Sequence, residues 1–336
     1  MNTISTAKRP RVMSGMRPTG RLHIGHYIGV LSQWVRYAQT ADAFFEVADL
    51  HAYTTGFADP QAIRDARNDM VIDWLAAGVD PKTSTFFLQS AIPEIAELQA
   101  LLAMITPVSW LERVPTYKGQ IEALGTEIAT YGFLGYPLLQ ICDIAVFRGE
   151  EVPVGRDQVA HLEFGREVVR RFNYLYAGGA PLLVEPKAML VEGGAEVPGT
   201  DGRKMSKSYE NTMLLADDEE TTTKKVRGMI TDPLKVRRND SGRPEVCPVF
   251  ALWQIVKPEH AAGVASGCRS GALGCVQDKT DFAEALNAYL RPVRERRALY
   301  AADPAQVESV LAEGTARARE VAAQTLADVR RAMRLT

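Results

Sequence analysis

The sequence has only four cysteines in 336 residues, and no apolar run approaches the roughly 18 residues that a membrane span needs. So few cysteines exclude a disulfide scaffold. Neither sign of charge is in excess, because 39 Lys and Arg stand against 41 Asp and Glu, a formal net charge of −2. This balance excludes general polyelectrolyte binding but is compatible with a local basic patch. Residues 1–11 are polar and lack the apolar segment of a signal peptide, which predicts a cytoplasmic protein with reduced thiols.

What the first 170 residues do contain is an alternation of short apolar strands and amphipathic helices. Strands are predicted at 11–16, 43–48 and 83–88, and helices at about 26–39, from 60 onward and at 93–105. Asp59-Pro60 supports the second helix, because Asp is a favoured N-cap and proline fits the first helical turn. The order predicts a Rossmann-like α/β fold, with a parallel sheet covered by helices on both faces.

The second part of the chain has a different character. A glycine-rich stretch at 192–202 breaks the alternation, and the segments 281–300 and 304–333 are alanine-rich and charged with helical periodicity. We therefore predict a catalytic α/β domain at 1–209 and a smaller α-helical domain at 210–336. The sequence leaves open whether the last helix packs back on the first domain.

A short histidine motif, His23-Ile24-Gly25-His26, lies between the first predicted strand and the first helix. Imidazoles can donate hydrogen bonds to phosphate oxygens, and the start of the following helix offers free N–H groups to an anion. The glycine lets a ligand approach the backbone. Several nucleotidyl-transferring families share this motif, and a pair of surface histidines in a turn is the alternative explanation.

A lysine motif, Lys204-Met205-Ser206-Lys207-Ser208, follows the glycine-rich stretch. Two lysines three residues apart on a loop can follow a triphosphate and neutralise the charge that builds on leaving pyrophosphate. A solvated basic loop is the alternative. Together the two motifs are far more specific than either alone, and they match the HIGH and KMSKS signatures of class I aminoacyl-tRNA synthetases.

Four further segments extend this resemblance over nearly the whole chain. They are SGMRPTG (14–20), ADLHAYT (48–54), GYPLLQICDIAVF (135–147) and VPVGRDQVAHLEFGREVVRRFN (152–173). The chain resembles the tryptophanyl–tyrosyl subgroup, and within it the bacterial tryptophanyl enzymes. The resemblance implies activation of L-tryptophan by ATP with Mg²⁺, then transfer to tRNA(Trp) with release of AMP and diphosphate. A tyrosyl enzyme, another nucleotidyltransferase and a non-catalytic, synthetase-like RNA-binding regulator are the rival interpretations.

The resemblance also implies which residues handle ATP. The expected catalytic residues are His23, His26, Lys204 and Lys207. The expected ATP contacts are Arg17, Pro18, Thr19, Gly25, His26, Gly155, Arg156, Asp157, Val197, Lys204, Met205, Ser206, Lys207 and Ser208. Three positions depart from the common family pattern, because Arg17, His26 and Arg156 stand where many relatives have glutamine, asparagine and glutamate.

Asp143 is the main candidate for recognition of the amino acid. It lies in an otherwise apolar stretch, where a buried carboxylate needs a donor, and an indole ring nitrogen can only donate. A helix-surface aspartate or a structural ion pair is the alternative. In the resembled family the matching aspartate holds the tryptophan ring nitrogen, and Gln158 matches a contact to the amino group. The other expected pocket residues are Met13, His51, Gln140, Val152 and Val154.

Two basic clusters suit phosphate contact, although a solvated helix face is an equally good explanation. They contain Lys224, Lys225, Arg227, Lys235, Arg237, Arg238 and Arg243, and Arg291, Arg294, Arg296 and Arg297. The resemblance implies that this helical domain reads the anticodon and that the enzyme is a homodimer.

Three cysteines, Cys247, Cys268 and Cys275, are spaced like part of the [4Fe–4S] site of some tryptophanyl enzymes, but the fourth position is Asp278. Because thiolates are the usual cluster ligands, we expect a lost iron–sulfur cluster and ordinary free thiols. Cys142, beside Asp143, is expected to be a small core residue.

Overall fold

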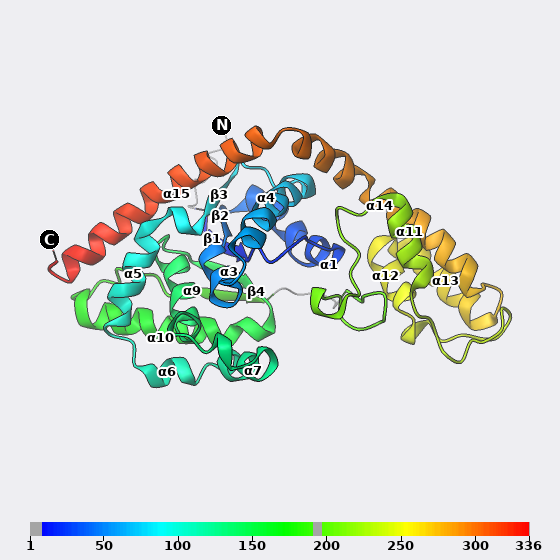
Figure 1. Ribbon diagram of the computed structural model, residues 1–336, viewed down its shortest axis with the longest axis horizontal. Coiled ribbons are helices and arrows are strands. Elements are labelled where there is room, and N and C mark those ends of the chain that lie inside the picture. Colours follow the sequence, from blue (N-terminus) through cyan, green and yellow to red (C-terminus); the bar gives the residue numbers. More distant parts are fainter. Residues whose placement is uncertain (1–8, 191–196, 336) are drawn as a thin grey trace, which may run out of the picture.

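The computed structural model describes residues 9–190 and 197–335 (Figure 1). In this part of the chain five parallel strands form a sheet of order β3-β2-β1-β4-β5. The strands are β1 (Arg11–Met16), β2 (Asp42–Val47), β3 (Ser84–Leu88), β4 (Glu151–Val154) and β5 (Lys187–Leu190). The predicted Rossmann-like fold is confirmed. The strand order reverses between β1 and β4, and ligands of such sheets bind at this switch point, beyond the carboxyl ends of the strands.

The first part of the chain supplies the helices around the sheet. They are α1 (Ile24–His26), the π-helical turn η1 (Tyr27–Leu31), α2 (Ser32–Thr40), α3 (Asp49–Gly56), α4 (Pro60–Ala77), η2 (Gln89–Ala91), α5 (Pro93–Ala103), α6 (Val108–Glu112), α7 (Pro115–Leu124), η3 (Thr126–Ile128), α8 (Tyr131–Leu134), α9 (Tyr136–Ala145), η4 (Arg156–Gln158) and α10 (Val159–Tyr176). The helix predicted at 26–39 is present but interrupted by η1. As expected, Asp59 caps α4, since its side chain accepts from the N–H of Ala62 at 3.0 Å.

Adjacent phenylalanines on β2 show how the two faces of the sheet are filled. Because neighbouring side chains of a strand point to opposite faces, Phe45 and Phe44 enter different cores. Phe45 stacks on Trp34 of α2 with the ring centres 4.2 Å apart. Phe44 stacks on Phe147, just after α9, at 5.1 Å. Helices therefore cover both faces, as the sequence predicts.

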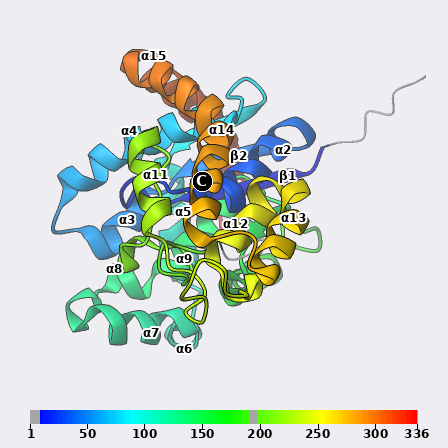
Figure 2. The same cartoon turned by 90° about the vertical axis from the view of Figure 1, so that its right-hand side faces the viewer.

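The second part of the chain is helical apart from its loops. It contains η5 (Lys207–Tyr209), α11 (Glu219–Gly228), η6 (Pro244–Val246), α12 (Pro248–Val256), α13 (Pro258–Ser270), α14 (Cys275–Ala302) and α15 (Pro304–Ala332). Figure 2 shows α11, α12 and α13 gathered near the first half of α14. None of the helices described combines the length and apolar character that a bilayer crossing requires. Residues 1–8 and 191–196, which hold most of the polar start and part of the glycine-rich stretch, lie outside the described residues.

The long helix α14 joins these helices to the sheet domain. Near its end, Arg297 pairs with Asp73 of α4 (Nε to Oδ1, 2.8 Å) and with Asp69 (Nη2 to Oδ1, 3.0 Å). Asp73 is buried, and burial raises the pKa of this carboxyl to about 6 while the charge of Arg297 opposes the rise. The pair fixes the end of α14 against the sheet domain.

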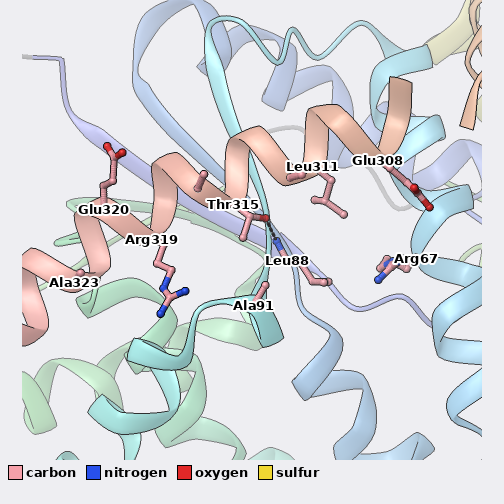
Figure 3. Close-up of a pocket in the computed structure, with 11 residues that line it drawn as sticks. Arg67, Leu88, Ala91, Glu308, Leu311, Thr315, Arg319, Glu320 and Ala323 are labelled. Carbon is pink, nitrogen blue, oxygen red and sulfur yellow. Dashed lines mark hydrogen bonds between the residues drawn. The ribbon is translucent and has the colours of Figure 1, made fainter. Parts of the chain in front are cut away.

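The last helix, α15, lies on the edge strand β3 (Figure 3). Thr315 Oγ1 accepts a hydrogen bond from the N–H of Leu88 at 3.1 Å. A Cβ on Gly314 would come within 1.9 Å of the carbonyl oxygen of Phe86, so only glycine permits this approach. A groove of about 730 Å³ runs beside this contact, lined by residues that include Ala91, Leu311 and Arg319. The C-terminal helix therefore packs back on the α/β part of the molecule, which answers the question that the sequence leaves open.

Candidate active site

The two histidines of the N-terminal motif pack against each other with their ring planes tilted by 37°. Their ring centres are 3.8 Å apart, and the backbone N–H of His23 donates to Nδ1 of His26 at 3.2 Å. Gly25 between them is required by space, because a Cβ there would lie 2.9 Å from Nδ1 of His23. The local sequence therefore places both imidazoles at the start of the first helical segment.

Both imidazoles are neutral at physiological pH. Burial lowers the pKa of His23 to about 4, and the charge of Lys207 lowers it further in the same direction. Burial lowers the pKa of His26 to about 3, with added contributions from His23 and Lys207. A neutral imidazole carries one N–H donor, so these residues can offer hydrogen bonds to phosphate but not positive charge.

The lysine motif lies directly beside the histidine motif, although about 180 residues separate them in the sequence. The N–H of Ile24 donates to the carbonyl of Met213 at 2.9 Å, and the N–H of Leu215 donates to that of Leu22 at 3.0 Å. Lys207 Nζ donates to the carbonyl oxygens of Thr19 and Gly20, at 3.1 and 2.8 Å. The structure therefore brings the two motifs together.

Asn211 holds the lysine loop in shape. Its buried side chain accepts from the N–H of Ser206 at 2.9 Å and donates to the carbonyl of Lys204 at 3.1 Å and to Asp201 at 2.6 Å. A Cβ on Gly199 would lie 2.2 Å from its amide nitrogen, which explains a glycine there. The sequence analysis missed Asn211, because an asparagine after a loop carries no distinctive pattern.

The two lysines of the loop occupy different environments. Lys204 is exposed, whereas Lys207 is partly buried. Burial lowers the pKa of Lys207 to about 8; Arg17 lowers it further, and Asp73 opposes the change. Met205, between the two lysines, is a core residue whose N–H donates to the carbonyl of Val197 at 2.8 Å. The hydroxyl oxygens of Ser206 and Ser208 lie 2.9 Å apart, within hydrogen-bond distance of each other.

The remaining predicted ATP contacts lie in several different places. Pro18, Thr19 and Val197 lie with the paired motifs, and the side chain of Val197 is 3.6 Å from the position of a Cβ on Gly25. Gly155 and Arg156 are exposed just beyond the carboxyl end of β4. Arg17 lines a separate small cavity, which Asp143 also lines. The side chain of Asp157 lies outside the described residues.

A small cavity of about 100 Å³ opens at the carboxyl ends of β1, β2 and β4. Met13, His51, Gln140, Asp143 and Val152 line it, as the resemblance implies. Val154 is buried in the adjoining core, and Gln158 is half-buried at the start of α10; neither belongs to the lining.

Asp143 is buried and bound on both carboxylate oxygens. Oδ1 accepts from Nε2 of Gln89 at 2.8 Å, and Oδ2 lies 2.8 Å from Nε2 of His51, which donates when that nitrogen carries the ring proton. The alternative of a helix-surface aspartate is therefore wrong, whereas the contact with His51 is compatible with the other alternative, a structural ion pair. Sequence reasoning missed Gln89, and also Tyr136, which lines the cavity and packs its ring edge-on against His51 at 4.3 Å. Tyr136 could have been predicted from the sequence, because it belongs to the family-like segment 135–147.

The cysteine group does not fit a [4Fe–4S] cluster. Cys247, Cys268 and Cys275 surround a cavity of only about 10 Å³, together with Lys235 and Asp278. Asp278 Oδ1 already accepts from the indole N–H of Trp253 at 2.9 Å. Among the described residues, no group of three or more His, Cys, Asp or Glu side chains is arranged to hold a metal ion. Cys142 is fully buried, as expected for a core residue.

Many side chains of the two basic clusters already form ion pairs or hydrogen bonds within the chain. Arg243 pairs with Asp232, Lys225 with Asp217, and Arg291 with Glu219. Arg294 donates to Thr222 and Asn287, Arg296 to the carbonyl of Ala76, and Lys235 to that of Asp240. The side chains of Lys224, Arg227, Arg237 and Arg238 are exposed and remain the better candidates for contact with a polyanion.

Comparisons with known proteins agree with this site. Residues 5–291 match the family of class I tRNA synthetases for tryptophan and tyrosine (W and Y), and the chain belongs to this family. The tryptophan--tRNA ligase of Thermotoga maritima is 46% identical over 97% of this chain and 99% of its own length. That of Ralstonia nicotianae is 42% identical over 97% and 98%. Within the family, these relatives confirm the prediction of a tryptophanyl-tRNA synthetase.

A solved structure supports the same assignment. The tryptophanyl-tRNA synthetase of Campylobacter jejuni, solved with ADP and tryptophan, superposes with a TM-score of 0.88 at 30% identity. The alignment covers 96% of this chain and 99% of that one. The arrangement of sheet and C-terminal helices is thus shared over the full length.

Proposed function

We propose that the paired motifs and the Asp143 cavity carry out the two steps of a tryptophan--tRNA ligase, the activity to which family membership assigns the chain. In the first step a carboxylate oxygen of tryptophan attacks the α-phosphorus of ATP. The bond from that phosphorus to the β-phosphate oxygen breaks, and tryptophanyl-adenylate and diphosphate form. No side chain acts as nucleophile, so catalysis consists of alignment and charge stabilisation.

The single observation that carries this proposal is the contact between Lys207 and the carbonyls of Thr19 and Gly20, which joins the lysine motif to the loop that leads into the histidine motif. An ammonium held by neutral carbonyls can exchange them for phosphate oxygens as ATP enters. The neutral His23 and His26 then donate hydrogen bonds, and Lys204 and Lys207 supply charge toward the leaving diphosphate. Mg²⁺ would be held by the phosphates themselves and by water.

The Asp143 cavity is proposed to hold the tryptophan ring. An indole N–H is a single donor, and Asp143 is an acceptor inside an otherwise largely closed site. Gln158, at the start of α10, is proposed to contact the amino group. The Campylobacter jejuni enzyme was solved with ADP and tryptophan, which supports binding of an adenine nucleotide and of tryptophan by this chain as well.

In the second step, a ribose hydroxyl of the terminal adenosine of tRNA(Trp) attacks the activated carbonyl, and AMP leaves. The exposed Lys224, Arg227, Arg237 and Arg238 are proposed to contact the tRNA backbone, which would make binding salt-dependent. We also propose that the enzyme acts in the cytoplasm as a homodimer. Candidates for that interface are three exposed apolar residues: Met104 just after α5, Val108 on α6 and Tyr131 on α8.

Amino-acid-dependent exchange of labelled diphosphate into ATP tests the proposal. We expect exchange with tryptophan and not with tyrosine or the other amino acids. Lys204→Ala combined with Lys207→Ala should reduce exchange by on the order of a hundredfold or more. Arg319→Ala, in the groove beside α15, is a matched control that should leave exchange intact. Near-normal exchange in the double lysine variant would show that the loop does not serve ATP.

A further inference from the structure

A second carboxyl group, Glu46 of β2, lies in the floor of the Asp143 cavity. It is 3% exposed and faces Gly15 of β1 across the parallel pair. A Cβ on Gly15 would lie 3.0 Å from the Cβ of Glu46, so the glycine leaves room for this side chain. The family resemblance gives Glu46 no role, and within the apolar run Phe44–Val47 a charged residue is unexpected.

The surroundings of Glu46 are short of hydrogen-bond donors. Its Oε1 is buried and has no donor in the described residues. Burial raises the pKa of Glu46 well above its usual range, and the charge of Asp143, a hydrogen bond to Asp143 and the charge of Asp49 all act in the same direction. A neutral glutamic acid removes the conflict, because it carries an O–H that can donate to the neighbouring carboxylate.

The acceptor positions of Asp143 are then almost filled. A carboxylate offers about four lone-pair positions. Gln89 and His51 occupy two of them, and a proton on Glu46, whose side chain lines the same cavity, can occupy a third. One position remains, which matches the single N–H of an indole ring.

We propose that Glu46 is a positioning residue for substrate selection: its carboxylic acid group donates to Asp143 and orients that carboxylate so that one acceptor faces the substrate N–H. This inference rests on the proposed use of the cavity for tryptophan. Two carboxyl groups that share one proton also give the pocket one negative charge instead of two. The free-energy cost of keeping these carboxyl groups away from water beside an apolar ring is therefore lower. Glu46 acts through Asp143 and takes no part in the chemistry of the phosphates.

The test compares Glu46→Gln, Glu46→Ala and Asp143→Asn in diphosphate exchange with tryptophan and with β-(3-benzothienyl)alanine, an analogue that lacks the ring N–H. Glutamine keeps a donor toward Asp143, so KM for tryptophan should stay within about threefold of wild type. In Glu46→Ala, KM for tryptophan should rise about tenfold, while KM for the analogue changes by less than about twofold. KM for ATP should not change in either variant, which checks that the protein is folded.

The pH profile supplies a readout that a purely structural role would not move. Once the pH exceeds the raised pKa of Glu46, ionisation of this carboxyl puts two charges side by side, so KM for tryptophan should rise in wild type and stay flat in Glu46→Gln. The other charged or titratable groups around the cavity, Asp49 and His51 of α3, Arg17, and Cys142 and Tyr136 of α9, are common to both proteins. The difference between the two profiles therefore reports Glu46.

The outcomes separate this inference from the proposed function. If Asp143→Asn leaves KM for tryptophan and the preference over the analogue unchanged, the cavity is not the tryptophan site. If Asp143→Asn abolishes the preference but Glu46→Ala keeps it, only the role of Glu46 is refuted. Matching alkaline profiles of wild type and Glu46→Gln would refute it as well.

Discussion

The lowered pKa of Lys207 makes a quantitative prediction about activity at alkaline pH. With a pKa of about 8, roughly nine-tenths of the Lys207 side chains carry charge at pH 7 and roughly one-tenth at pH 9. If only the charged form assists ATP, kcat/KM for ATP should fall about tenfold between these values, because this parameter reports the free enzyme. An arginine at this position stays charged throughout, since its pKa lies above about 12.

The assay is diphosphate exchange at saturating tryptophan from pH 6.5 to 9.5, with wild type, Lys207→Arg and Lys207→Met. Wild type should show the fall, and Lys207→Arg should lack it whatever its absolute rate. Lys207→Met should be slow at every pH, because it lacks the group that titrates. A fall of equal size in Lys207→Arg would assign the titration to another group and refute the reasoning.

Three further predictions follow. The folded-state pKa values of His23 and His26 are about 4 and 3, below the unfolded value near 6.5, so the unfolded chain takes up protons first as the pH falls. The free energy of unfolding should therefore fall between about pH 6.5 and pH 4, by up to about 1.4 kcal/mol per pH unit per histidine. Denaturation of the His23→Gln/His26→Gln variant at the same pH values should lack this slope. Asn211→Ala should lower kcat of exchange on the order of tenfold or more and speed amide exchange in the lysine loop. Unchanged values of both would show that other contacts hold the loop. Gly314→Ala should cost about 1–3 kcal/mol through its clash with Phe86, measured by thermal unfolding, whereas the exposed Gly263→Ala should not.

Sequence patterns identified the strands that are long enough to carry a period. The first three strands were predicted to within one residue of β1, β2 and β3. The four-residue strands β4 and β5 were not found, because four residues show no clear alternation and β4 contains Pro153. The π-helical turn at 27–31 was also missed, since its side chains fit a helical period.

The candidate site was predictable where a motif specifies it and not where it depends on tertiary contacts. The histidine and lysine motifs stand out in the sequence, and the structure places them side by side. By contrast, the donors to Asp143 come from 54 and 92 residues away, and no local pattern connects them. The same limit explains the basic clusters, because partners such as Asp73, 224 residues from Arg297, cannot be read from a charge pattern.

Arg297 and Asp73 link the long helix α14 electrostatically to Lys207 of the lysine motif. The negative charge of Asp73 raises the pKa of Lys207, and the charge of Asp73 is itself maintained by Arg297. A tilt of α14 that withdrew the guanidinium would favour the neutral form of the aspartic acid, and the ammonium would then lose a counter-ion across the α4 helix. A reorientation of the distal helices would thus change the protonation of Lys207, the proposed phosphate contact, without any motion of the loop that carries it.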